Sequence, residues 1–194
     1  MKKTVLFTLV IVLGVVFGAQ YAAGDSDERE SGREDDDGIF SSMFRHDQDL
    51  AMVRNETYQE ECGSCHMAYP AGLLPARSWE KLMGNLDDHF GDNAELDMST
   101  RQELTRYLLE NSADHSDARR SRKIMRSLGA AEIPLRITDT RYFRHEHDEL
   151  PAAVVKANPQ VSSFSNCNAC HKRAEEGSFS EREIHIPGYG RWDD

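Results

Sequence analysis

The sequence predicts a mostly α-helical fold with long irregular loops and little or no β structure. Apolar residues recur at helical spacing in several segments, and proline and glycine separate these segments. No run alternates apolar with polar residues as a half-buried strand would. Hydrophobic residues make up 39% of the 194 residues and charged residues 29%, which is typical of a soluble protein with a rather thin apolar core.

The first 37 residues differ in composition from the rest of the chain. Lysines at positions 2 and 3 precede an apolar run, and small residues follow it up to Gly24. This pattern predicts a secretory signal peptide over 1–24, with an uncleaved N-terminal anchor as the alternative. Residues 25–37 hold eight acidic side chains and no aromatic or branched apolar ones, which predicts a disordered acidic linker. The folded domain is therefore expected over 38–194.

Helices are predicted where apolar periodicity and capping residues coincide. Ser78 is the expected cap of the first, and a capping box at Thr100 and Glu103, or at Ser99 and Gln102, is expected to start the second. The predicted segments are 79–90, about 100–111, 117–128, 140–150 and a final turn over 166–171. Side chains expected to face inward are Trp79, Leu82, Met83, Leu86, Phe90, Leu104, Tyr107 and Leu108.

The net charge of −11 restricts the partners that we expect. An acidic chain binds nucleic acid poorly, and no basic patch for anionic lipid is expected. The charge either serves solubility alone or steers the protein towards a basic face on a partner protein.

Two pentapeptides contain all four cysteines of the chain, and both have the pattern Cys-x-x-Cys-His. Two thiols on one turn of backbone can add to the two vinyl groups of a haem, and the adjacent histidine can then reach the iron. This attachment takes place outside the cytoplasm, in agreement with the predicted export signal. We therefore predict two covalent c-type haems, bound by Cys62, Cys65, Cys167 and Cys170, with His66 and His171 as axial ligands.

A redox dithiol or a zinc site is the competing interpretation of each Cys-x-x-Cys pair. A zinc ribbon has its second pair about 15–20 residues after the first, whereas Cys65 and Cys167 are 102 residues apart. A dithiol would not explain why histidine follows both pairs.

The second axial ligand of each iron decides what such a protein does, because an open position permits oxygen or peroxide chemistry and a filled one gives an electron carrier. Of the remaining histidines, His89 is favoured, since it follows His66 by 23 residues on the predicted apolar helix. His145 and His147 precede the second motif and are too close together to bind the same iron easily. The other histidines, His46, His115 and His185, are expected in solvent. Met83 and Met98 are the alternative ligands among the methionines.

Two stretches of the sequence resemble the dihaem cytochrome c family of bacterial periplasmic carriers. The first reads ECGSCHMAYPAGLLPARSWEKLMGNLDDHFGDNAELD, and the second combines LRITDTRYFRHEHDELPAAVV with SSFSNCNACHKRAEEGSFSEREIHIPG. The likeness spans roughly residues 50–190 and includes Pro, Trp, Phe and Gly positions around the motifs.

The resemblance implies two low-spin haems with two histidines each, and electron transfer with another cytochrome. That cytochrome would be a small high-spin, oxygen-binding c-type protein or a membrane b-type protein, and neither a small-molecule substrate nor nucleic acid is expected. His89 matches one distal ligand and His147 the other, with His145 as the alternative. The expected pairs are His66 with His89 and His171 with His147, although a crossed pairing stays open.

Other residues are expected to support the haems. Arg77, Arg136 and Arg141 are candidates to offset propionate charge, and Asp87 or Glu146 to accept a hydrogen bond from a ligand histidine. The rival functions are a dihaem peroxidase, a gas-binding haem protein with one open iron site, and a structural subunit tethered to a membrane oxidoreductase by an uncut N-terminus.

Overall fold

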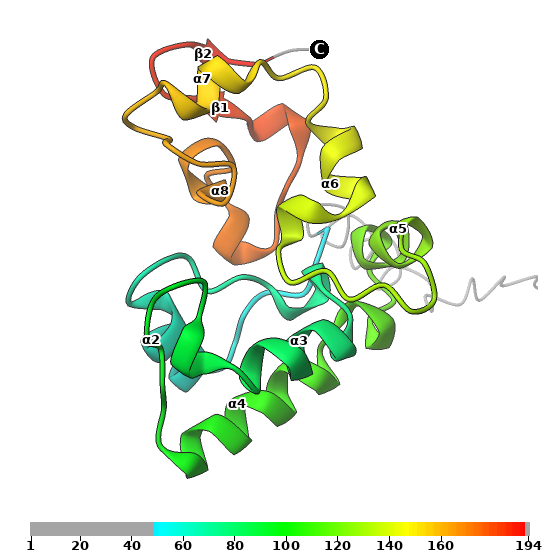
Figure 1. The fold of residues 1–194 in the computed structure, drawn as a ribbon. Helices are drawn as coiled ribbons and strands as arrows, with labels where there is room; N and C mark the ends of the chain where they lie inside the picture. The colour runs from blue at the N-terminus through cyan, green and yellow to red at the C-terminus, as the bar shows by residue number, and fades with distance from the viewer. Residues whose placement is uncertain (1–48, 193–194) are drawn as a thin grey trace, which may run out of the picture. The chain divides into compact units, whose positions relative to one another are not determined.

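The computed structural model describes residues 49–192, in which helices joined by long loops form the fold and one short hairpin is the exception (Figure 1). The helices are α2 (Glu56–Gly63), α3 (Ala76–Met83), α4 (Met98–Glu110), α5 (Arg119–Ser127), α6 (Arg141–Glu146), α7 (Ala152–Lys156) and α8 (Cys167–Cys170). The predicted mostly α-helical fold with long loops is confirmed. The predicted signal peptide, the acidic linker, the start of the folded domain and His46 lie outside the described residues.

The hairpin lies in the tail, which the sequence predicted to be irregular. Strand β1 (His185–Ile186) pairs antiparallel with β2 (Gly190–Arg191). Gly188 and Gly190 both have positive φ and close the turn between the strands. Because each strand has only two residues, no alternating pattern could reveal them in the sequence.

Helix α3 begins and ends earlier than the apolar pattern predicted. Pro75 precedes its first turn, so Ser78 is a buried residue of the helix and not its cap. The helix ends at Met83 because Gly84 and Asn85 are poor helix formers. A 3₁₀ turn over Leu86–Asp88 follows, and His89 lies just beyond that turn.

Helices α4, α5, α6 and α8 lie where the sequence predicted them but have different caps or ends, whereas α2 and α7 were not predicted. Asp97 caps α4 by accepting hydrogen bonds from the backbone N–H groups of Ser99 and Thr100, so neither predicted capping box forms. Thr140 caps α6, whose helix ends at Glu146, four residues before the predicted end.

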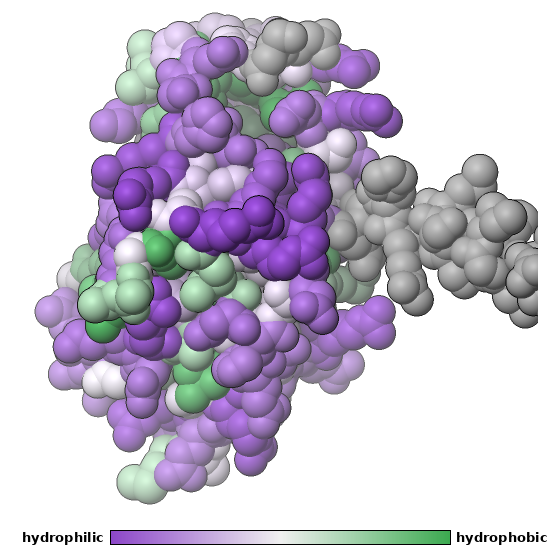
Figure 2. Space-filling model, turned by 90° about the vertical axis from the view of Figure 1, so that its right-hand side faces the viewer, coloured by the Kyte–Doolittle hydropathy of each residue, from purple (hydrophilic) through white to green (hydrophobic). Residues whose placement is uncertain are grey.

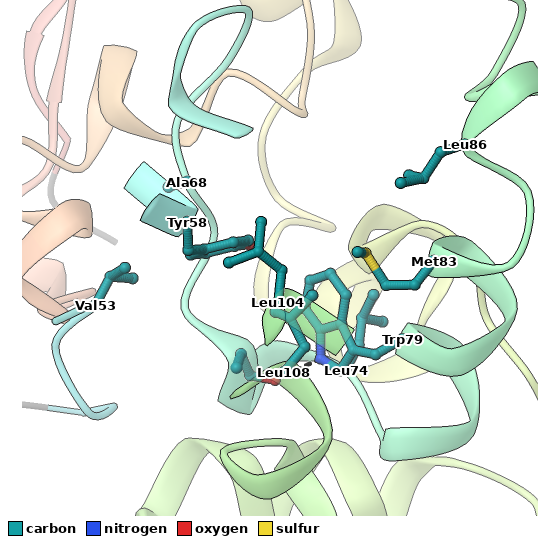
Figure 3. Packing of buried hydrophobic residues seen from close by; sticks show 10 residues of the cluster. Val53, Tyr58, Ala68, Leu74, Trp79, Met83, Leu86, Leu104 and Leu108 are labelled. Carbon is teal, nitrogen blue, oxygen red and sulfur yellow. Dashed lines mark hydrogen bonds between the residues drawn. The ribbon is translucent and has the colours of Figure 1, made fainter. Parts of the chain in front are cut away.

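The larger core cluster lies between α3 and α4 (Figure 3). Leu104 and Leu108 of α4 are fully buried there, together with Trp79 and Met83 of α3. The indole N–H of Trp79 donates to the Ala71 carbonyl at 2.8 Å. Of the side chains predicted to face inward, Leu86 is also buried, Leu82 and Tyr107 are partly buried, and Phe90 is 43% exposed.

Helix α5 is a basic patch, contrary to the expectation from net charge. It carries five basic side chains and no acidic one over Arg119–Ser127. Net charge is a sum over the whole chain, so it did not reveal that the positive charges are concentrated on one helix. Within residues 49–192, no helix is long and apolar enough to cross a membrane.

Candidate haem sites

Both Cys-x-x-Cys-His motifs include part or all of a short helix. Cys62 is in the last turn of α2, and the second motif forms α8 itself. None of the four cysteines is in a disulfide. Burial raises the pKa of Cys62 to about 11 and that of Cys167 to about 11, so both thiols are protonated at neutral pH. His66 and His171 each follow the second cysteine of their motif directly, so each histidine lies beside the two thiols that would bind a haem.

His66 and His89 face one another at the first motif. Their ring centroids are 6.2 Å apart and their planes differ by 24°. The Nδ1–H of His66 has the Met67 carbonyl as partner at 2.8 Å, which leaves Nε2 available to a metal. A tight turn holds His89, because its backbone N–H donates to the Asp92 carbonyl at 2.7 Å. Phe90 adopts the left-handed φ of 61° inside this turn, which is a strained conformation for a bulky residue.

His147 and His171 form the corresponding pair at the second motif. Their ring centroids are also 6.2 Å apart, but their planes differ by 75°. The Nδ1 of His147 has the Phe143 carbonyl as partner at 2.9 Å, and the imidazole of His147 stacks on the Phe143 ring with centroids 4.0 Å apart. The backbone N–H of His171 donates to the Cys167 carbonyl at 2.8 Å.

The separation within each pair fits one metal ion between two imidazoles. A metal–imidazole bond is about 2.0–2.1 Å long, and the ring centroid lies about 1.1 Å behind the nitrogen. Two imidazoles on opposite sides of one ion therefore have centroids about 6.2 Å apart. The structure brings together the pairs expected from sequence proximity, and their binding of iron stays a prediction.

Burial favours the neutral form of three of these histidines, which is the form that a metal ligand needs. Burial lowers the pKa of His89 and of His147, and it lowers that of His171 to about 4. The Nδ1 atoms of His89 and His171 are buried without a hydrogen-bond partner among the described residues. Neither Asp87 nor Glu146 accepts a hydrogen bond from these rings; backbone carbonyls are the acceptors for His66 and His147.

The remaining candidate ligands are less well placed. The side chain of His145 is 80% exposed and lies 3.7 Å from Asp148, so His147 is the better placed of the two. The Nδ1 of His115 has the Leu109 carbonyl as partner, and His185 is exposed in β1. Met98 is 69% exposed. Met83 contacts the first cavity, but it is part of the buried cluster, so its role is packing.

A cavity surrounds each histidine pair. The first, of about 950 Å³, is lined by Cys62, Cys65, His66 and His89 among many apolar side chains. The second, of about 330 Å³, is lined by Cys170, His171 and His147. The two cavities share part of their walls: Ile137, Val161, Ser163, Asn166 and Cys167. Groups held in the two cavities would therefore be neighbours.

Of the three arginines predicted near propionates, only Arg136 lines a cavity wall. Its guanidinium lies 3.8 Å from the centroid of the Phe90 ring. Arg77 instead donates to the backbone carbonyl of Glu132 at 2.6 Å, and Arg141 lies 3.7 Å from the carboxylate of Glu132.

Tyr69 links the two motifs, and nothing in the sequence pointed to it. Its ring stacks on His66 with centroids 4.9 Å apart, and its hydroxyl donates to the Ser165 carbonyl at 2.6 Å. Burial raises its pKa to about 12, and the neighbouring Cys167 adds to this shift. The hydrogen bond joins residues 96 positions apart, so no local pattern could have revealed it.

Arg120 is the second residue that sequence reasoning missed. Its side chain lines the second cavity and is only 13% exposed. It donates to Asp49 at 2.7 Å, to the Tyr142 hydroxyl at 2.6 Å and to the Phe179 carbonyl at 3.0 Å. Its place within a run of basic residues gave no sign that this one turns inward.

Comparison with known proteins agrees with this arrangement. A family profile described as dihaem cytochrome c matches residues 58–179. The structure is similar to a dihaem cytochrome c of Shewanella baltica OS155, with 42% identity over 73% of this chain and 100% of that one, at a TM-score of 0.60.

Two structures from Rhodobacter sphaeroides are also similar. One is of a dihaem cytochrome c and has 43% identity over 67% of this chain and 100% of that one, at a TM-score of 0.60. The other, of purified DHC, has 39% identity over 66% of this chain and 99% of that one, at a TM-score of 0.51. No curated protein sequence gives a match.

Proposed function

This chain belongs to the dihaem cytochrome c family and carries two c-type haems, and we propose that it is a periplasmic electron carrier in which both irons have two histidine ligands. His66 and His89 serve the first haem, and His171 and His147 the second. The observation that supports this most directly is the 6.2 Å separation of the rings in both pairs, each beside its own Cys-x-x-Cys-His motif.

A haem iron, when bound, supplies one-electron chemistry by changing between the ferric and ferrous states. The protein contributes attachment through Cys62, Cys65, Cys167 and Cys170, and ligand orientation through backbone carbonyls. The Met67 and Phe143 carbonyls fix the tautomers of His66 and His147, so that Nε2 of each ring is offered to the metal. The shared cavity wall around Cys167 supports electron exchange between the two centres.

The partners follow from the same proposal. The protein would pass electrons between a membrane or soluble cytochrome and a partner haem protein, such as a small high-spin c-type cytochrome. The predicted signal peptide over 1–24 supports the periplasmic location, because haem attachment to these motifs takes place there. Fractionation of expressing cells tests this point, and recovery of the haem protein from the cytoplasm would contradict it.

Spectroscopy of the purified ferric holoprotein tests the ligand assignment. We expect only low-spin signals in electron paramagnetic resonance and no methionine–iron charge-transfer band in absorption. A high-spin signal of one haem equivalent would overturn the proposal and favour a peroxidase-like or gas-binding protein with an open iron site. Intact mass should exceed that of the processed polypeptide by two haems.

A further inference from the structure

The outward face of α5 is strongly basic in a chain whose net charge is −11. Arg119, Arg122 and Arg126 are spaced by three and four residues, so they lie on one side of the helix. All three are exposed, and Lys123 beside them is 41% exposed. We call these four residues, Arg119, Arg122, Lys123 and Arg126, the basic face. Figure 2 views the side on which α5 and α6 lie in Figure 1, and strongly hydrophilic side chains cover the middle of that side.

Much of this charge is not neutralised by neighbouring acids. Arg119 lies 3.3 Å from Asp49, and Lys123 lies 3.9 Å from Glu146. Within residues 49–192, Arg122 and Arg126 form no ion pair, and their side chains donate only to backbone carbonyls of Asp117 and Arg122. Exposed pairs contribute little and are easily exchanged, so the face stays available to a partner.

The opposite side of the same helix lines the second haem site. Ile124 is 1% exposed, and together with Arg120 it forms part of the wall of the cavity that contains His147 and His171. One helix therefore separates the basic face from this site. A protein docked on the basic face would therefore be separated from the second haem site by this one helix, whereas no residue of α5 lines the first cavity.

Helix α2 at the first haem site has the opposite charge. It carries Glu56, Glu60 and Glu61 and no basic residue; all three side chains are exposed, and Glu61 directly precedes Cys62. The two haem sites thus present surfaces of opposite sign, which would distinguish two redox partners by charge.

We propose that the basic face is the docking surface for an electron-transfer protein with an acidic face, which exchanges electrons with the second haem. This inference rests on the proposed function, since it assumes that the second site holds a redox centre. Charge complementarity favours a compact acidic protein over a membrane or a nucleic acid. An extended anionic surface would also meet the rest of this acidic chain and be repelled by it, whereas a small protein can contact the basic face alone.

The dependence of the reaction on salt separates this proposal from the effect of net charge. Two acidic proteins repel each other overall, so net charge alone predicts that their reaction becomes faster as salt rises. Docking on the basic face predicts the reverse, because salt screens the local attraction. Local steering raises association rates by about 10- to 1,000-fold.

The test uses dithionite-reduced holoprotein and oxidised rubredoxin, a small acidic iron–sulfur protein, mixed by stopped flow. One electron leaves a ferrous haem iron, which becomes ferric, and reduces the rubredoxin iron from ferric to ferrous; no bond is formed or broken. We expect the bimolecular rate of the wild type to fall with rising salt. The R122E/R126E variant should react at least about tenfold more slowly at low ionic strength. The wild type and the R122E/R126E variant should react with rubredoxin at similar rates near 1 M salt, where the screening length is about 3 Å.

R101E/R106E is the matched control, because Arg101 and Arg106 are exposed arginines of α4 and the two variants change the net charge by the same amount. It should leave the rate close to that of the wild type. Binding of the oxidised proteins, measured by calorimetry at low salt, should weaken in R122E/R126E and not in R101E/R106E. Equal rates for both variants, or a wild-type rate that rises with salt, would overturn the proposal.

Vesicle binding and sedimentation distinguish a protein partner from a membrane and from a second copy of this chain. Binding to phosphatidylserine vesicles that is lost in R122E/R126E would assign the face to a membrane and refute a protein partner. Sedimentation at several concentrations would detect a second copy of this chain on the face, which would also refute it. If the untreated holoprotein shows a high-spin haem, the proposed function fails. If both haems are low-spin but R122E/R126E binds and reduces rubredoxin as the wild type does, only this inference is refuted.

Discussion

Replacing Tyr69 by Phe should loosen the segment that carries the second motif. The hydroxyl of Tyr69 donates to the Ser165 carbonyl at 2.6 Å, and the other neighbour of that carbonyl is the Cys167 sulfur at 3.7 Å. Once Cys167 is bonded to haem, its sulfur has no proton to donate. The variant therefore leaves a half-buried carbonyl unpaired, at a cost of about 1–3 kcal/mol, or a roughly 5- to 150-fold rise in local opening.

Hydrogen exchange of the holoprotein measures this opening. The backbone N–H groups of Ala169 and His171, which bond to the Asn166 and Cys167 carbonyls, should exchange faster in Tyr69→Phe by that factor. The control is Tyr58→Phe, which removes a hydroxyl that donates to the Tyr69 carbonyl at 2.9 Å, only 11 positions along the chain. It should leave exchange at Ala169 and His171 unchanged. Equal exchange in Tyr69→Phe and the wild type would refute the role of Tyr69 as the link between the motifs.

Three other substitutions test separate parts of the structure. His89→Ala should open one of the two irons and let the ferrous protein bind one CO per chain, followed by absorption, whereas the exposed His145→Ala should bind none. Leu104→Ala should lower the free energy of unfolding by about 2–5 kcal/mol, measured with denaturant, because the side chain is 0% exposed; a cost below about 1 kcal/mol would contradict its place in the core. Burial raises the pKa of Asp49, but the hydrogen bond and charge of Arg120 outweigh burial and hold it below its usual value. The stability from this pair is therefore present above pH about 4 and lost as pH falls through the folded pKa. Asp49→Asn should make the free energy of unfolding depend less on pH below about 4. The same pH dependence in the variant and the wild type would refute this.

The sequence was most informative where chemistry requires fixed spacing. The two Cys-x-x-Cys-His motifs predicted the haems, because attachment needs both thiols and the histidine within five residues. Apolar periodicity located the α3–α4 core correctly, and Leu86 is buried even though the helix has ended before it. Periodicity reports which side chains share a face and not which hydrogen bonds continue, so it extended this helix too far.

Other features depended on contacts that only the folded chain provides. Asp97, Ser99 and Thr100 are all good caps in succession, and local sequence could not decide which of them the helix would use. The Tyr69–Ser165 hydrogen bond and the Arg120–Asp49 pair join residues 96 and 71 positions apart. Such pairs leave no pattern in a single sequence, because each residue is ordinary in its own segment.

The angle between the histidine rings differs between the two sites, 24° in the first pair and 75° in the second. In the proposed ligation by two histidines, each imidazole would donate π density to the iron d orbital that lies perpendicular to its plane, so the ring angle would make the two sites chemically different. Rings 24° apart, as for His66 and His89, act mainly on one orbital and separate the energies of the two dπ orbitals. Rings 75° apart, as for His147 and His171, act on both orbitals and leave their energies nearly equal. Ferric holoprotein should therefore give two low-spin resonances, a rhombic one from the first site and a more anisotropic one from the second. His89→Ala should remove the rhombic resonance and His147→Ala the anisotropic one; loss of the same signal in both variants would contradict the separate pairing.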